Sequence, residues 1–558
     1  MTLLTNSQAL SSSPPTNQAQ RLIQLRKAKG LTTEQLAKQM TQAGAKVSRG
    51  AVSNWERGTN GIVSSKLPIL AKILGCSESY LLTGENNLSA LHHLASADNS
   101  TPTTIPLAVQ KTPNSTQIQP NQLTPSTILS SAIMSPMSPL PPISASAPLR
   151  PLKKSAKLQN VCYDIRGPLL QMANQMETQG HKILKLNIGN PAPFGLEAPQ
   201  EILSDVAMNL ANATGYSESQ GIFAARKAIL QYYQSKGLLE AVDVNNVYVG
   251  NGVSELIVMT MQALLDDGDE VLIPMPDYPL WTAATNLAGG KAVHYLCNEE
   301  DNWQPDIADI ERKITPNTKG IVVINPNNPT GALYSTDNLK QIVALAEKHN
   351  LVLMADEIYD RVLYDAAVHV PLCTLAKNCL VLSYNGLSKS HRIAGFRSGW
   401  LMISGKKDHA SDFIEGLNML ASMRLCANVP VQYAIQTAMG GYQSMQALTA
   451  ESGRLYKQRD VAITRLNAIK GISCTMPQVA FYCFPKIDRT IYPIEDDTAF
   501  MMELLQAEKV LMVQGTGFNW HAPDHFRVVF LPNEFDLNEA MDRLDRFFAK
   551  KRQEFGTD

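Results

Sequence analysis

Lys389 and Arg397 lie eight residues apart in SYNGLSKSHRIAGFRSGW, a segment rich in Gly and Ser. A cofactor that binds as an imine needs a lysine amine for its aldehyde, and a phosphate group on it needs a cation. Lys389 could hold the aldehyde and Arg397 the phosphate. Taken alone, a lysine in such a loop is more often a solvated surface residue, so the assignment depends on other residues.

Two polar segments, NPNNPTG at residues 325–331 and DEIYD at residues 356–360, each follow an apolar run typical of a buried strand. Open α/β sheets bind ligands at the carboxyl ends of their strands. Asp356 could keep a pyridine nitrogen protonated, which makes the ring an electron sink. Asn328 and Tyr359 could hydrogen bond a ring oxygen and lower the pKa of the imine. Separately, the segments could be a turn and a capped helix start.

The segment YVGNGVSELI predicts a strand that passes through a Gly-Asn-Gly turn into a helix. The first amides of that helix, at Gly252, Val253 and Ser254, could bind a phosphate group. By itself this turn is weak evidence, since it could equally be a tight connection between two elements.

Apolar runs alternate with helical stretches from residue 156 onward, which predicts a mostly parallel α/β sheet covered by helices on both faces. The expected strands are NNVYVG, DEVLIPM, GIVVINP, LVLMADE and CLVLSYN, and the expected helices include VSELIVMTMQALL and STDNLKQIVALAEKHN.

The 558 residues exceed what one core usually covers, so we expect several parts. Residues 1–19 and the Pro/Ser/Thr-rich residues 86–155 are expected to be disordered, residues 20–85 to form a helical module, and residues 156–558 to form the α/β domain. Residues 20–85 carry ten Lys or Arg against four Asp or Glu, a net charge of +6 within a chain of net charge −1.

Global composition points to a globular protein without a membrane span or secretion signal, which we expect in the cytoplasm. The eight cysteines are scattered without CxxC pairs or close Cys/His clusters, so we expect thiols, no disulfide framework and no metal site.

Asn328, Asp356, Tyr359, Lys389 and Arg397 together resemble, in order and spacing, the signature of fold type I aminotransferases, over roughly residues 157–550. The resemblance implies a large domain built on a mostly parallel sheet of the seven-stranded type, a smaller α+β domain and bound pyridoxal 5′-phosphate. It also implies that Lys389 is both the cofactor's anchor and the base that moves the substrate's α-proton, with ping-pong kinetics.

The same resemblance implies roles for four further residues. Tyr278 would stack on the pyridine ring, although packing in a core is the ordinary alternative. Tyr216 would reach the phosphate of a neighbouring subunit, which implies a homodimer. Arg527, with Gly189 opposite, would bind the substrate's α-carboxylate, although an arginine flanked by apolar residues could instead pair with a buried acid.

Gly386 is a departure from the family pattern, because many relatives have a phosphate-binding serine three residues before the lysine. Ser388 could substitute for it. The departure affects that single contact.

The segments VCYDIRGP, LNIGNPAPFG, PDYPLWTAA, MLASMRLCANVP and FPKIDRT resemble bacterial glutamate–pyruvate (alanine) aminotransferases. This implies interconversion of L-alanine and 2-oxoglutarate with pyruvate and L-glutamate. Tyr163 and Arg166 could recognise the distal carboxylate of glutamate, or could equally be an exposed pair that contacts the dimer partner.

Residues 20–85 are expected to form five short helices, and TTEQLAKQM followed by SRGAVSNWERG resembles the helix-turn-helix of Cro and phage-repressor modules. The resemblance implies that DNA bases face Arg49, Gly50 and Asn54, that Arg26 and Glu56 form a structural ion pair, and that Trp55 is core. Thr33 stands where relatives often have a phosphate-contacting Gln, while the charge of +6 favours DNA. The alternative is a protein-interaction module.

Two functions are therefore consistent with one chain. The first is an active alanine aminotransferase that carries a DNA-binding module. The second is a transcription regulator whose aminotransferase-like domain senses the cofactor or an amino acid. The complete set of site residues, including Arg527, favours the first.

Overall fold

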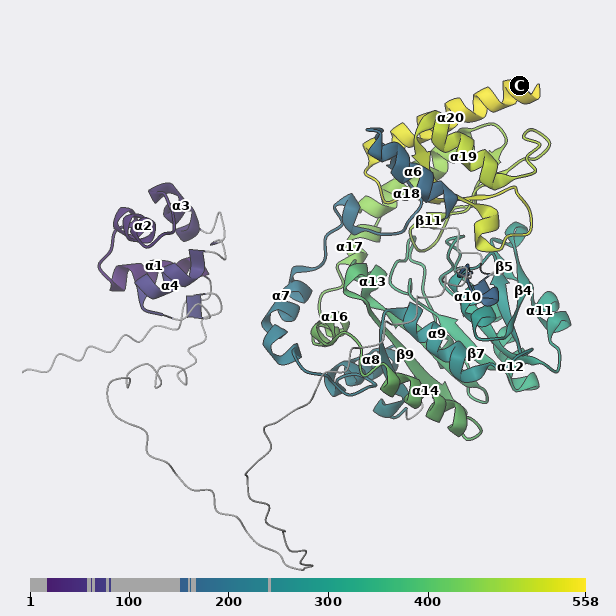
Figure 1. Ribbon diagram of the computed structural model, residues 1–558, viewed down its shortest axis with the longest axis horizontal. Coiled ribbons are helices and arrows are strands. Elements are labelled where there is room, and N and C mark those ends of the chain that lie inside the picture. The colour runs from purple at the N-terminus through teal and green to yellow at the C-terminus, as the bar shows by residue number, and fades with distance from the viewer. Residues whose placement is uncertain are drawn as a thin grey trace, which may run out of the picture. The chain divides into compact units, whose positions relative to one another are not determined.

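The computed structural model describes residues 18–57, 62, 66–76, 80–81, 151–158, 161, 167–238 and 242–557 (Figure 1). The chain divides into two compact units, residues 1–141 and 142–558. Most of the expected disordered tail and linker, and both Tyr163 and Arg166, lie outside the described residues. The first helix begins at Gln18, two residues inside the expected tail.

Four helices make up the described part of the first unit: α1 Gln18–Ala28, α2 Thr33–Gln42, α3 Arg49–Glu56 and α4 Leu67–Leu74. Thr32 and Gln35 form a capping box at the start of α2, and Ser48 caps α3. The expected fifth helix is represented by Tyr80 and Leu81, which are helical, and its other residues lie outside the described part. The helices share a core that includes Leu22, Leu36, Met40, Val52, Trp55 and Leu70.

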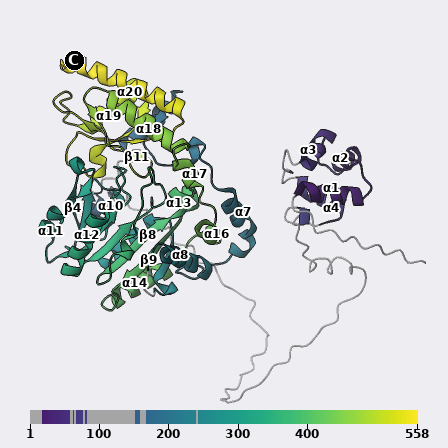
Figure 2. The same ribbon diagram turned by 180° about the vertical axis from the view of Figure 1, so that it is seen from behind.

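The second unit is built on one large sheet with the strand order β2-β9-β8-β7-β6-β3-β4-β5. Figure 2 shows its strands β4, β8 and β9. Strand β9 is antiparallel to both neighbours, the two-residue strand β5 is antiparallel to β4, and every other neighbouring pair is parallel. The strands are β2 Val247–Asn251, β3 Glu270–Met275, β4 Lys291–Asn298, β5 Gln304–Pro305, β6 Thr318–Ile324, β7 Val352–Asp356, β8 Leu380–Gly386 and β9 Ser398–Gly405. The expected mostly parallel sheet of the seven-stranded type is confirmed, with β5 as an addition.

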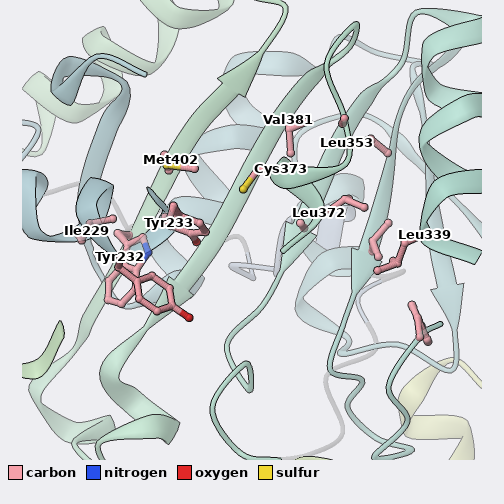
Figure 3. Close-up of a cluster of buried hydrophobic side chains, with 14 of the residues drawn as sticks. Ile229, Tyr232, Tyr233, Leu339, Leu353, Leu372, Cys373, Val381 and Met402 are labelled. Atoms are coloured by element: carbon pink, nitrogen blue, oxygen red, sulfur yellow. The ribbon is translucent and has the colours of Figure 1, made fainter. Parts of the chain in front are cut away.

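Helices cover both faces of this sheet, which explains why strands such as β3, β7 and β8 are buried along almost their whole length. Alternate side chains point to opposite faces, so that Val271 and Ile273 join one core and Leu272 the other. One face packs against α9 Val253–Leu264, α10 Leu280–Leu287 and α14 Ser411–Met423. The other packs against α8 Phe223–Ser235, α11 Ile307–Lys313, α12 Thr336–His349 and α16 Ile435–Gly440, and Figure 3 shows part of this core, including Tyr233, Leu339 and Met402.

A smaller α+β domain is formed by residues from both ends of this unit, as expected. Its helices α6 Pro168–Thr178, α18 Arg454–Ala468, α19 Asp497–Glu508 and α20 Glu534–Phe555 share a core with short strands. The pairs and triplet are β1 Leu184–Lys185 with β13 Val510–Leu511, β10 Ile472–Ser473 with β12 Lys486–Ile487, and β11 Tyr482–Cys483 with β15 Phe526–Val529 and β14 Val513–Gln514. The remaining α-helices are α7 Gln200–Met208, α13 Leu387–Ser390, α15 Val429–Gln432 and α17 Met445–Thr449.

The strand register places the predicted site residues at one edge of the sheet. Asp356, the last residue of β7, pairs with Ile324 of β6 on one side and with Tyr384 of β8 on the other. The segment NPNNPTG begins directly after Ile324, and Lys389 follows the end of β8. The carboxyl ends of three parallel strands therefore present the predicted residues together.

Within the described part of the chain, no helix is long and apolar enough to cross a membrane, and no group of three or more His, Cys, Asp or Glu could hold a metal ion.

Candidate active site

A cavity of about 200 Å³ lies at the carboxyl ends of β6, β7 and β8. Eleven of the predicted site residues line it: Gly189, Val253, Ser254, Tyr278, Asn328, Asp356, Tyr359, Ser388, Lys389, Arg397 and Arg527. Its other lining residues are Ile188, Ile257, Ile324, Ile358, Ala394 and Tyr482. Segments that are more than 300 residues apart in the sequence thus meet in one cavity, as from Gly189 to Arg527.

Lys389 lies in α13, a single helical turn that begins immediately after β8. Its Nζ atom donates a hydrogen bond to the backbone oxygen of Gly189 at 2.8 Å, and it lies 5.9 Å from the centre of the Tyr359 ring. The half-buried amine is thus held in the cavity between the large and the small domain.

Asp356 is only 3% exposed. Trp281 Nε1 donates to its Oδ2 at 3.0 Å, and the backbone N–H of Ile358 donates to its Oδ1 at 3.4 Å. Burial raises the pKa of Asp356 to about 6, while the Trp281 hydrogen bond and the charge of Lys389 act in the opposite direction. A carboxyl group with this pKa is suited to share a proton with a pyridine nitrogen.

Tyr359 and Asn328 also line the cavity and offer hydrogen-bond donors. Burial and then the neighbouring Tyr482 raise the pKa of Tyr359 well above its usual value, so its hydroxyl stays protonated and can donate. Asn328 Oδ1 accepts from Arg527 Nη1 at 2.9 Å, which turns the amide nitrogen of Asn328 into the group that can donate to a ligand.

Arg527 projects from β15 and is 2% exposed. Besides its hydrogen bond to Asn328, its Nη2 donates to the backbone oxygen of Asn187. Its guanidinium group lies 4.5 Å from the ring centres of both Tyr482 and Phe518. An arginine held by an amide, a carbonyl and two rings keeps its charge available to a carboxylate.

One corner of the cavity gathers groups that could bind an anion. Arg397 Nη2 donates to Ser254 Oγ at 3.0 Å, beside the N-terminus of α9, where Gly252 has a φ of 81° and no side chain caps the helix. A Cβ atom on Gly252 would lie 2.2 Å from Arg397 Nη2. The corner thus combines helix-start amides, a hydroxyl and a guanidinium, and only glycine leaves room for them.

The departure at Gly386 has a steric reason. Gly386 pairs with Gly399 across β8 and β9, and a Cβ atom at residue 386 would lie 2.6 Å from the Ser398 oxygen. A serine there would require the two strands to separate. Ser388, which lines the cavity, is the nearby hydroxyl.

Tyr216 is not among the cavity residues, and its side chain is 80% exposed. Besides the apolar lining residues, two residues with polar groups at the site were not predicted from the sequence, namely Trp281 and Tyr482. Trp281 follows Tyr278 by three residues at the start of α10, and its backbone N–H donates to the Tyr278 oxygen at 3.1 Å, a spacing that could have indicated it. Tyr482 lies in the apolar stretch AFYCF, which resembles any buried strand and carries no signal of its own.

The helical module contains the expected structural pair. Arg26 Nε lies 2.5 Å from Glu56 Oε1, and Trp55 is buried in the core. Arg49 and Gly50 are exposed in the first turn of α3, and Thr33 begins α2.

Asn54, a predicted base-contacting residue, is half-buried, and its Oδ1 accepts from Arg57 Nη2 at 2.8 Å. Arg57 lies at the end of α3 and was not predicted to take part. Its bond to Asn54 makes it a further candidate on this face of the module.

The chain matches two family descriptions: aminotransferase class I and II over residues 181–544, and helix-turn-helix over residues 22–81. The glutamate–pyruvate aminotransferase AlaA of Haemophilus influenzae is 59% identical over 405 residues, which are 73% of this chain and 100% of that protein. The alanine aminotransferase of Mycobacterium tuberculosis is 58% identical over 404 residues, which are 72% of this chain and 94% of that protein.

Solved structures agree with these relatives. An aminotransferase from Escherichia coli is 57% identical, with a TM-score of 0.71, over 72% of this chain and 99% of the other. The alanine aminotransferase from Pyrococcus furiosus is 37% identical, with a TM-score of 0.67, over 71% of this chain and 100% of the other. The fold type I architecture expected from the sequence is confirmed, and an amino-terminal helix-turn-helix module precedes it. This chain belongs to the class I and II aminotransferases.

Proposed function

We propose that this protein is a pyridoxal-phosphate-dependent alanine aminotransferase that interconverts L-alanine and 2-oxoglutarate with pyruvate and L-glutamate. The observation that carries the proposal is a single cavity lined by the Lys389 amine, the Asp356 carboxyl group and the Arg527 guanidinium. Relatives named for glutamate–pyruvate or alanine transamination, which this chain matches over nearly their whole length, support the substrate assignment.

The donor set fits the cofactor at each of its ends. Arg397, Ser254 and the first amides of α9 would hold the phosphate, Asp356 would face the ring nitrogen, and Tyr359 and Asn328 would face the ring oxygen. Tyr278 lies on the cavity wall where an aromatic ring could stack on the cofactor. When bound, pyridoxal phosphate supplies an aldehyde that links to amines and a ring that withdraws electrons from the substrate's α-carbon.

The chain's own residues would orient the substrate and move its proton. Arg527 would bind the α-carboxylate through a bidentate pair of hydrogen bonds, with Asn328 and Gly189 beside it. Lys389 would take up the α-proton on Nζ once that amine is free. The same Nζ atom would then release the proton to complete the transfer. The hydrogen bond from Nζ to the Gly189 oxygen supports this role, because it holds the amine next to the substrate's expected position.

Turnover of the purified full-length protein with alanine and 2-oxoglutarate tests the proposal. Pyruvate should form in the wild type and should not form in Lys389→Ala. Lys340→Ala is the matched control, because Lys340 is an exposed lysine of α12 far from any assigned role. Absence of pyruvate from the wild type would refute the enzyme assignment. Aspartate in place of alanine tests the substrate class, since an aspartate aminotransferase of Bacillus is 29% identical.

We propose that Tyr163 and Arg166 bind the distal carboxylate of glutamate. Arg166→Ala should impair glutamate turnover more than alanine turnover, because only glutamate carries the second carboxylate. Equal losses for the two substrates would assign the pair to the dimer contact instead.

A homodimer is the proposed assembly, with Tyr216 reaching the partner subunit's phosphate site. Its support is exposure: several large apolar side chains of the described residues are open to solvent, among them Met208, Leu210, Tyr216, Phe223, Met419 and Met423. Such exposure is typical of surfaces that are covered in an oligomer. Sedimentation velocity on the holoenzyme should give a dimer mass, and a monomer at working concentration would refute the assembly.

DNA binding is the proposed role of the amino-terminal module. The exposed Arg49 and Gly50 on α3, together with the charge of +6 over residues 20–85, support it. A gel shift with the protein's own promoter should weaken as salt is raised, and Arg49→Ala should weaken it more than Lys72→Ala on α4. Lack of a shift at low salt would leave a protein-interaction module, and a shift without alanine turnover would favour the sensor function.

A further inference from the structure

Tyr482 lines the cavity but is not one of the residues predicted to bind the cofactor or the substrate. It is the first residue of β11, which pairs with β15 so that Tyr482 lies opposite Val529, two residues from Arg527. Its side chain is 2% exposed and lines the cavity together with Lys389 and Arg527. A polar group buried at this position needs a partner, and it has three neighbours in the site.

The hydroxyl of Tyr482 lies 2.5 Å from the hydroxyl of Tyr359. The face of its ring lies 4.5 Å from the Arg527 guanidinium. On the third side is Gly189, where an added Cβ atom would lie 2.0 Å from the Tyr482 oxygen. Tyr482 therefore touches the tyrosine expected at the cofactor, the arginine expected at the substrate and the glycine that receives the Lys389 hydrogen bond.

We propose that Tyr482 is a positioning residue that links the two halves of the site: its ring holds Arg527, and its hydroxyl donates to Tyr359. This inference rests on the proposed function, because it concerns how Tyr359 meets the cofactor's ring oxygen. A hydroxyl group donates one hydrogen bond and accepts up to two. If Tyr482 donates to the Tyr359 oxygen, the Tyr359 proton is directed at the ring oxygen.

Coupled hydrogen bonds strengthen one another in a buried site. Burial and the neighbouring Tyr482 raise the pKa of Tyr359, so the Tyr359 hydroxyl retains its proton for such a chain. A donor that is itself an acceptor becomes more polarised, by about 10–30% in condensed-phase estimates. A stronger bond from Tyr359 draws negative charge away from the nitrogen through which Lys389 holds the cofactor, and so lowers the pKa of that nitrogen.

Tyr482→Phe isolates this effect, because it removes the hydroxyl and keeps the ring beside Arg527. In the holoenzyme, the pH midpoint of the cofactor's visible absorption change should rise by roughly 0.5. Tyr364→Phe is the matched control. Tyr364 is another buried tyrosine of the small domain, whose hydroxyl donates to the Ala480 oxygen at 2.9 Å, and it does not line the cavity. Its midpoint should equal that of the wild type.

The double variant tests the route of the effect. In a Tyr359→Phe background, Tyr482→Phe should cause no further rise in the midpoint, since Tyr482 acts through Tyr359. A rise of equal size in both backgrounds would overturn the inference, as would an unchanged midpoint in the single variant. Kinetics add a second readout: kcat for alanine should fall while KM changes little, because the ring still holds Arg527.

Two further results separate the possible failures. A wild type that shows no cofactor absorption or no alanine turnover refutes the proposed function, whereas a normal wild type with an unshifted Tyr482→Phe refutes only this inference. If Tyr482→Phe yields no folded holoenzyme, Gly189→Ala displaces the same hydroxyl from the opposite side. Its midpoint should also rise, and an unchanged value would overturn the inference.

Discussion

Replacing Asp356 by Asn should stabilise the cofactor-free protein above pH 6 and weaken its hold on the cofactor. Burial raises the pKa of Asp356 from 3.8 to about 6 in the folded protein. When folding raises the pKa of a carboxyl group, the group does not reduce the free energy of unfolding at a pH below its unfolded pKa. As the pH rises from the unfolded pKa through the folded pKa, the free energy of unfolding falls. The buried ion at neutral pH is therefore a source of instability that Asn does not share.

The magnitude follows from the two pKa values. The difference between 3.8 and about 6 corresponds to about 3 kcal/mol of unfolding free energy, lost by the wild type across that pH range. Asn offers one acceptor oxygen to the two donors, Trp281 and Ile358, so the variant should lose about 1 kcal/mol at every pH. The variant should thus be less stable than the wild type near pH 4 and about 2 kcal/mol more stable near pH 8.

Urea unfolding of the cofactor-free protein at several pH values, followed by tryptophan fluorescence, measures this difference. Asp365→Asn is the matched control, because the stability that Asp365 contributes should change with pH in the opposite direction. The hydrogen bond from Arg459 lowers the pKa of Asp365, so its contribution is lost as the pH falls. A gap between wild type and Asp356→Asn that does not change with pH would refute the reasoning. With pyridoxal phosphate added, the wild type should gain more stability than the variant.

Three other changes test separate parts of the molecule. Arg527→Lys removes the planar fork that suits a carboxylate, so kcat/KM for alanine should fall roughly 100-fold in steady-state assays, and an unchanged value would contradict the carboxylate role. Gly252→Ala adds a Cβ atom 2.2 Å from Arg397 Nη2, and cofactor affinity in equilibrium dialysis should fall by roughly tenfold or more. Unaltered affinity would place the phosphate elsewhere. Arg26→Ala leaves Glu56 without its cation, and the module should lose about 2 kcal/mol, seen as faster hydrogen exchange in α1 to α4 and not in residues 167–557.

The strands and most of the residues that line the cavity were predictable because their signals are local. A buried parallel strand is a short apolar run, and the polar group that follows it marks the ligand-binding edge. Asp356 and Asn328 each follow such a run directly, and the order of their motifs along the chain pointed to Lys389. The helix starts at Thr32 and Ser48 also have local signals, since capping depends on residues three positions apart.

Other features depend on neighbours that are distant in the sequence. The absence of a side chain at Gly386 was visible as a departure, but its reason is the Ser398 oxygen on the adjacent strand. Asn54 was expected to face bases, and only the folded module shows that Arg57 holds its oxygen. The residues Tyr163 and Arg166 lie outside the described residues, so their assignment stays a prediction.

By itself, the sequence determined the fold class, the family and most of the polar residues that line the cavity, because these follow from local periodicity and from motif order. Only the tertiary structure decided which side chains of the site hydrogen bond with one another. Tyr359 and Tyr482 are 123 residues apart, and nothing in AFYCF distinguishes Tyr482 from core. Their hydroxyls meet because residues 362–364, just after Tyr359, pair through backbone hydrogen bonds with residues 478–480, just before Tyr482. Packing over such distances has no period in the sequence, so its contacts appear only in the folded chain.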